Sequence, residues 1–134
     1  MSSKLCFSPT SKELLQVEQT VLTLDFSNDS RAAIYEFNKK FELSKKAERS
    51  FPSSFLCCDW DFQDHIGAGC EGGQALLCKK DDFETAELLS VTESDITVLR
   101  FSDESENCVA VGTEDGQVLF LNMSGQVLFK AQTR

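Results

Sequence analysis

Two stretches of the chain repeat one pattern at an interval of about 40 residues, and this repeat restricts the fold more than any other feature. The stretches are residues 55–80 and 96–122. Each begins with an alternating apolar–polar run that ends in an aromatic residue, Trp60 in one and Phe101 in the other, and each continues through small residues to a glycine turn. A repeat of this length predicts a series of similar structural units.

Each repeat predicts four short antiparallel β-strands. The alternation of period two is typical of half-buried strands. Tight turns are expected at Gly72-Gly73 and at Asp115-Gly116, because glycine adopts positive φ without steric cost. A polar break and a fourth apolar run follow in both copies, at residues 85–91 and 125–129. Four such strands in a unit of about 40 residues are the pattern of a β-propeller blade.

A more degraded copy lies at the N-terminus. Residues 4–9 match the first strand, residues 27–30 match the hairpin turn, and residues 32–37 match the strand after it. The longer spacing predicts an insertion near residues 16–20, and Phe41-Glu42-Leu43 could begin the fourth strand.

We therefore predict an all-β fold of about three four-stranded antiparallel units. The units cover residues 4–50, 51–93 and 94–134, and together they form one partial propeller domain. The alternative is a compact β-sandwich or barrel of about eleven strands.

The repeats resemble the WD-repeat family of β-propellers. Residues 7–15, FSPTSKELL, resemble the opening FSPDG-K-x-L of that family; residues 34–37, IYEF, resemble its I-W-D-L strand ending; and residues 109–116, VAVGTEDG, resemble its LA-x-G-x-x-DG hairpin. No Gly-His precedes a first strand and no Trp-Asp closes a third strand. The aspartate–histidine hydrogen-bond network of well-formed repeats is therefore expected to be absent.

Three blades are too few for a ring, which usually needs four to eight. The chain could be a fragment or short isoform of a longer propeller. It could also complete a ring, either as a homodimer or with blades of another protein. The abrupt end after an apparent strand favours the fragment.

The charge of the chain excludes several classes of partner. With 22 acidic and 13 basic residues the net charge is −9, which disfavours nucleic acid and anionic lipid. No apolar run is long enough to cross a bilayer, and no signal peptide is visible. We therefore expect a cytoplasmic protein that could be associated with the cytoskeleton.

Neither a metal nor a cofactor is expected. The six cysteines include no C-x-x-C pair, and the adjacent Cys57 and Cys58 would point to opposite faces of a strand. Residues 67–72 match G-x-G-x-x-G by letters, but no helix follows to bind a phosphate. Gly67 and Gly69 more simply relieve crowding where strands of neighbouring blades pack.

The chain also lacks a G-x-S-x-G motif, so no catalytic residue is assigned. The resemblance implies a non-enzymatic protein–protein interaction scaffold or adaptor segment, possibly of a cytoskeletal, ciliary or trafficking complex. The alternative is a small β-domain enzyme or ligand-binding protein, in which Asp64, His65 and Cys70 would be the residues to replace.

Six residues are candidates for partner binding. Lys39, Lys40, Lys45 and Lys46 form a basic patch that suits an acidic partner such as a tubulin tail or an acidic peptide, unless it is simply a solvated strand face. Phe51 and Phe83 lie in or beside predicted loops, where an aromatic ring can anchor a partner peptide or fill the core of a blade.

Overall fold

The computed structural model describes residues 3–19, 30–102 and 108–133, and these residues form three four-stranded antiparallel sheets. In each sheet the strands follow one another in chain order and each pairs with the next. The prediction of an all-β fold with three four-stranded units is therefore confirmed.

The strand bounds are as follows. The first sheet contains β1 (Ser3–Phe7), β2 (Glu13–Gln19), β3 (Ser30–Phe37) and β4 (Leu43–Phe51). The second contains β5 (Phe55–Trp60), β6 (His65–Cys70), β7 (Gln74–Lys79) and β8 (Leu88–Ser90), with the short 3-10 turns η1 (Glu71–Gly73) and η2 (Lys80–Asp82). The third contains β9 (Ile96–Phe101), β10 (Cys108–Thr113), β11 (Gln117–Asn122) and β12 (Val127–Gln132).

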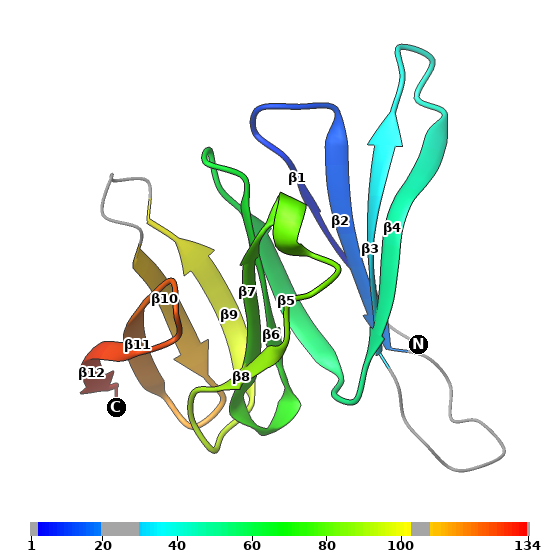
Figure 1. Ribbon diagram of the computed structural model, residues 1–134. Coiled ribbons are helices and arrows are strands. Elements are labelled where there is room, and N and C mark those ends of the chain that lie inside the picture. The colour runs from blue at the N-terminus through cyan, green and yellow to red at the C-terminus, as the bar shows by residue number, and fades with distance from the viewer. Residues whose placement is uncertain (1–2, 20–29, 103–107, 134) are drawn as a thin grey trace, which may run out of the picture.

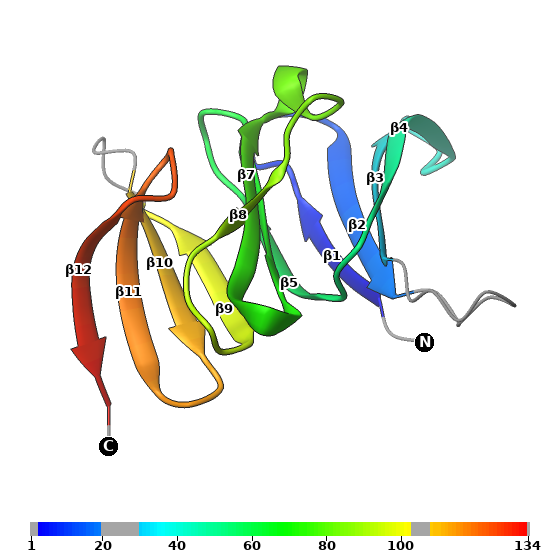
Figure 2. The same ribbon diagram turned by 60° about the horizontal axis from the view of Figure 1, so that its bottom comes forward.

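The three sheets stand side by side like the leaves of a fan, with the second sheet between the other two (Figure 1). Their first strands lie together, since β5 packs against both β1 and β9. The last strands, β4 and β12, lie at opposite ends of the molecule (Figure 2). The sheets form neither a two-layer sandwich nor a closed barrel, so that alternative is wrong.

Two hydrophobic clusters hold the sheets together. One lies between the first and second sheets and includes Leu15, Ile34 and Trp60; the other lies between the second and third sheets and includes Leu99 and Phe101. Strand β6 is buried along its whole length, because it has a neighbouring sheet on each side.

The two adjacent cysteines of β5 point to opposite sides, as predicted: Cys58 packs against the first cluster and Cys57 against the second. The prediction for the two glycines of β6 is also confirmed. A Cβ atom on Gly67 would lie 2.9 Å from Leu99 Cδ2, and one on Gly69 would overlap the side chain of Ile96. Glycine at these positions lets the third sheet approach β6 closely.

The structure corrects the sequence analysis at several positions. The insertion predicted near residues 16–20 does not begin at Gln16, because β2 continues to Gln19. Residues 27–29 of the predicted N-terminal turn lie outside the described part of the chain. The predicted strand over residues 85–91 is reduced to the three residues of β8. Among the described residues, no helix has the length and apolar character needed to cross a membrane.

Candidate protein-interaction surfaces

Lys39 and Lys40 lie at the tip of the β3–β4 hairpin, where both are exposed. Asn38 shapes the turn, since its side-chain Oδ1 accepts hydrogen bonds from the backbone nitrogens of Lys40, at 2.8 Å, and Glu42, at 3.1 Å. The amide of Asn38 also donates to the Glu42 carboxylate at 2.9 Å. Neither lysine forms a salt bridge with a described residue, so both ammonium groups face solvent.

Lys45 and Lys46 follow on β4, but they do not extend this tip into one basic patch. Ile34 of β3 pairs with Ala47 and Tyr35 pairs with Lys45, so Lys46 is the extra residue of a β-bulge in β4. Lys45 lies 3.0 Å from Glu48, and this hydrogen bond is the main cause that lowers the pKa of Glu48. Lys46 lies 3.4 Å from Glu36 and lines a hollow toward the second sheet. Each is thus paired with a carboxylate.

Phe51 and Phe83 are buried, with 4% and 1% of their surface exposed. Both belong to the cluster between the first and second sheets. Arg49 links them, because its guanidinium carbon lies 4.5 Å from the centre of the Phe51 ring and its Nη1 donates to the Phe83 carbonyl at 2.8 Å. These two rings fill the core, which is the second of the two interpretations that the sequence left open.

An exposed aromatic row on the first sheet was missed by the sequence analysis. Phe7 contacts Phe37 edge to face, and Phe37 stacks on Phe41, each with ring centres 6.1 Å apart. Phe41 is 80% exposed and has a positive φ of 61°, which is unusual for a bulky residue. Leu5 and Leu43 are also exposed beside this row, opposite the side that packs on the second sheet. We call these five residues the outer face of the first sheet.

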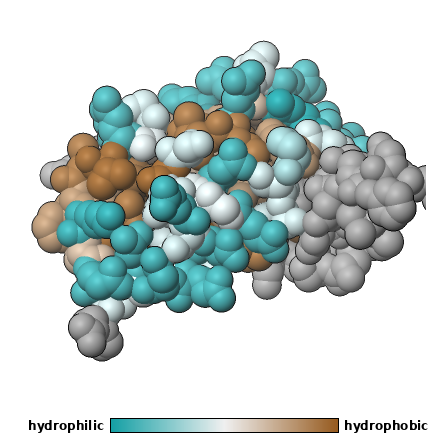
Figure 3. All heavy atoms as spheres, turned by 90° about the horizontal axis from the view of Figure 1, so that it is seen from below, coloured by the Kyte–Doolittle hydropathy of each residue, from teal (hydrophilic) through white to brown (hydrophobic). Residues whose placement is uncertain are grey.

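The third sheet has a comparable outer face. It consists of side chains that point away from the second sheet on all four strands: Val98, Ala110, Val118, Phe120 and Phe129. Phe120 and Phe129 contact each other with ring centres 6.0 Å apart. Seen from below, hydrophobic residues reach the surface at the end of the molecule that this sheet forms (Figure 3). The sequence did contain a signal for this face, because the strands of the third sheet carry apolar residues at positions of both faces rather than of one.

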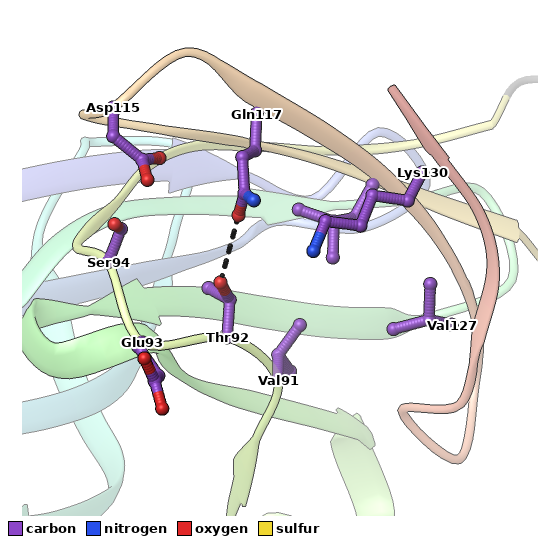
Figure 4. Close-up of a pocket in the computed structure, with 9 residues that line it drawn as sticks. Val91, Thr92, Glu93, Ser94, Asp115, Gln117, Val127 and Lys130 are labelled. Atoms are coloured by element: carbon purple, nitrogen blue, oxygen red, sulfur yellow. Dashed lines mark hydrogen bonds between the residues drawn. The ribbon is translucent and has the colours of Figure 1, made fainter. Parts of the chain in front are cut away.

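A groove of about 440 Å³ separates the second and third sheets at their outer edges. Its walls are the connection from Val91 to Ser94 and the side chains of Asp115, Gln117, Val127 and Lys130 (Figure 4). Thr92 Oγ1 donates to Gln117 Oε1 at 3.1 Å across it. Hydrogen bonds from Thr113 and Ser94 lower the pKa of Asp115. None of the lining residues is a histidine or cysteine.

The residues named for an enzymatic alternative brace a hairpin. His65 is the first residue of β6 rather than a loop residue, and its Nδ1 lies 2.8 Å from Asp61 Oδ2. Asp64 Oδ1 accepts a hydrogen bond from Trp60 Nε1 at 3.0 Å. An aspartate–histidine pair is thus present inside the β5–β6 hairpin, and its histidine begins a second strand rather than preceding a first strand as in the family motif.

The thiols of Cys70 and Cys78 have a structural role. Burial is the main cause that raises the pKa of Cys70 to about 12, and it does the same for Cys78. Within the described ranges, no three His, Cys, Asp or Glu side chains gather closely enough to hold a metal ion.

Comparison with known proteins identifies the fold. No protein-family model matches the chain, and no curated protein sequence matches it significantly. The crystal structure of the C-terminal WD40 domain of Sif2 superposes with a TM-score of 0.75 and 17% sequence identity, and the match covers 98% of this chain and 37% of that one. The chain thus spans well under half the length of this neighbour. It has the β-propeller fold of WD40 domains and contains three consecutive four-stranded blades of it.

Proposed function

We propose that the chain is a non-enzymatic protein–protein interaction scaffold or adaptor segment, in which residues 4–50, 51–93 and 94–134 are three units of one partial propeller domain. The supporting observation is the apolar surface exposed at both ends of the fan, on the outer faces of the first and third sheets. Contiguous exposed apolar patches are uncommon on proteins that act alone and mark interaction sites.

The tip of the β3–β4 hairpin is the surface for an acidic partner. Phe41 projects beside Lys39 and Lys40, so an apolar anchor stands next to two unpaired positive charges. An acidic peptide with an apolar side chain complements this arrangement, because the lysines attract its carboxylates and the ring packs on its anchor. A tubulin tail, and a place in a cytoskeletal, ciliary or trafficking complex of the cytoplasm, are specific forms of this proposal.

The test is the binding of a fluorescent glutamate-rich peptide that contains one leucine, followed by fluorescence anisotropy. We expect the double variant Lys39→Glu/Lys40→Glu to bind it about three- to tenfold more weakly than the wild type, since exposed ion pairs each contribute up to about 1 kcal/mol. The matched control is Lys79→Glu/Lys130→Glu, which reverses two exposed lysines elsewhere and keeps the same net charge. An equal loss of peptide affinity in both double variants would show that only the overall charge matters. Unchanged peptide affinity in both would contradict the proposed surface.

A further inference from the structure

The contact between the second and third sheets has a definite pattern of large and small residues. Leu99 and Phe101 of β9 project from the third sheet toward Gly67 of β6, and Leu77 of β7 packs beside them. Large side chains of the third sheet thus lie against a glycine-lined surface of the second sheet.

The outer face of the third sheet resembles the surface of the second sheet that contacts Leu99 and Phe101, and we call it the receiving face. Ala110 lies between Arg100 and Phe120 in the strand register, as Gly67 lies between Asp59 and Leu77. By the same register Gly112 and Val118 correspond to Gly69 and Ala75. Gly112 is not crowded, because a Cβ atom there would make an ordinary contact with Val98 at 3.7 Å.

The outer face of the first sheet resembles the surface of the third sheet that carries Leu99 and Phe101, and we call it the projecting face. Phe7 ends β1 opposite Leu14, as Phe101 ends β9 opposite Val109. Leu5 then corresponds to Leu99. Whereas Leu99 and Phe101 are buried, Leu5 and Phe7 are 58% and 62% exposed, so no sheet of the described part of the chain packs on them.

The charges favour contact between unlike ends. Residues 1–51 carry eight Lys and Arg against seven Asp and Glu, whereas residues 94–134 carry three against six. Two third sheets placed face to face would bring two acidic regions together. A first sheet placed on a third sheet instead joins the nearly neutral region to an acidic one.

We propose that two copies of the chain associate head to tail, with the outer face of the first sheet of each copy packed on the outer face of the third sheet of the other. Both ends of each fan are then covered, and the pair forms a closed ring of six sheets, within the range of four to eight that propellers use. This rests on the proposed interaction function and names a second copy of the chain as the partner of the two outer faces. Lys39 and Lys40 of the hairpin tip belong to neither face, whereas Phe41 belongs to the first.

One polar contact changes in the new interface. Asp59 Oδ2 accepts a hydrogen bond from the backbone nitrogen of Phe101 at 3.0 Å, and Arg100 occupies the corresponding position on the third sheet. Arg100 is exposed and pairs with Ala110, so the hydrogen bond that Asp59 accepts has no counterpart in the proposed interface.

The experiment is light scattering over a concentration series with wild type and three variants. Phe7→Glu places a charge on the projecting face and Val98→Glu places one on the receiving face, where Val98 is 50% exposed. Phe62→Glu is the control, since Phe62 is 68% exposed in the β5–β6 hairpin and belongs to neither face. Circular dichroism and Tm establish that each variant is folded.

We expect wild type and Phe62→Glu to reach twice the 14.9 kDa chain mass, while Phe7→Glu and Val98→Glu remain at the chain mass. Mixing the two defective variants must restore the doubled mass, because one intact contact forms between the unmodified first sheet of one and the unmodified third sheet of the other. A wild type that stays at the chain mass, a doubled mass that survives both substitutions, or oligomers that grow without limit would each overturn the proposal. Peptide binding is tested separately by Lys39→Glu/Lys40→Glu, because these two lysines belong to neither outer face.

Discussion

At the scale of single residues, side-chain size on β6 sets how closely the second and third sheets approach. Gly69 and Gly112 occupy corresponding positions in the second and third sheets, yet their surroundings differ. A Cβ atom on Gly69 would overlap Ile96 and lie 2.8 Å from Cys57 Sγ, whereas one on Gly112 has an ordinary contact at 3.7 Å. The same residue type is therefore required in one sheet and tolerated in the other.

We predict that Gly69→Ala lowers the free energy of unfolding by about 1 to 3 kcal/mol, the usual cost of overpacking a well-packed interface. The matched substitution Gly112→Ala should change it by no more than about 0.5 kcal/mol in either direction. Urea unfolding at low protein concentration measures both. Equal effects would mean that the second and third sheets are not packed as described.

At the scale of elements, an ion pair connects the first two sheets. Lys80 of η2 donates to Glu13 Oε1 of β2 at 2.8 Å, and Ser11 Oγ donates to the same oxygen at 3.0 Å. The Glu13 side chain is only 7% exposed. The hydrogen bond to Glu13 is the main cause that raises the pKa of Lys80 above its usual value of 10.5.

Replacing Lys80 by glutamine should therefore destabilise the protein by about 1 to 3 kcal/mol at pH 7, because a buried carboxylate loses its charged partner. Since the folded pKa of Lys80 is raised, the contribution of the lysine is fully present below pH 10.5 and disappears as the pH rises through the folded value. The difference between wild type and Lys80→Gln in urea midpoint should consequently shrink above pH 10.5. Lys79→Gln, an exposed neighbour, should show neither effect, and a constant difference across this range would exclude the ion pair as its source.

The order of the strands and their turns could be predicted because the signals are local. Asp115-Gly116 and Gly72-Gly73 do form turns, with glycine φ values of 89° at Gly116 and 75° and 81° at Gly72 and Gly73. The arrangement of the candidate site could not be predicted in the same way. Lys45 and Lys46 are adjacent in sequence, but they pair with different carboxylates, Glu48 and Glu36, and Lys46 is the extra residue of a β-bulge. These pairings depend on the strand register, which a local pattern does not contain.

The sequence also could not predict which aromatic side chains are buried. Phe83 and Phe41 both follow short polar runs that contain lysine, and both were placed near predicted loops or strand starts. The ring of Phe83 is buried by the neighbouring sheet, while that of Phe41 projects from a hairpin tip. The difference depends on contacts between sheets that are far apart in sequence, which a local pattern does not contain.

At the scale of the whole molecule, the fan has two unlike ends. The end formed by the first sheet exposes projecting rings and carries most of the basic residues, and the end formed by the third sheet exposes a flat apolar surface in an acidic region. Exposed sheet faces of this kind are an aggregation hazard unless another protein surface covers them. We therefore predict that Phe7→Glu and Val98→Glu, which remain single and each leave one apolar outer face uncovered, aggregate more readily on heating than Phe62→Glu, as monitored by light scattering. The opposite ranking would show that association does not cover the outer faces.

The most direct test of the claim that these outer faces bind protein is site-specific photo-cross-linking of the purified chain. A benzophenone amino acid in place of Phe7 should give a product of two chains, in which position 7 is joined to a residue of the third sheet, between Ile96 and Gln132. The same amino acid at position 62 should give little of this product. Cross-links confined to the chain that carries the probe, at every concentration, would contradict the account.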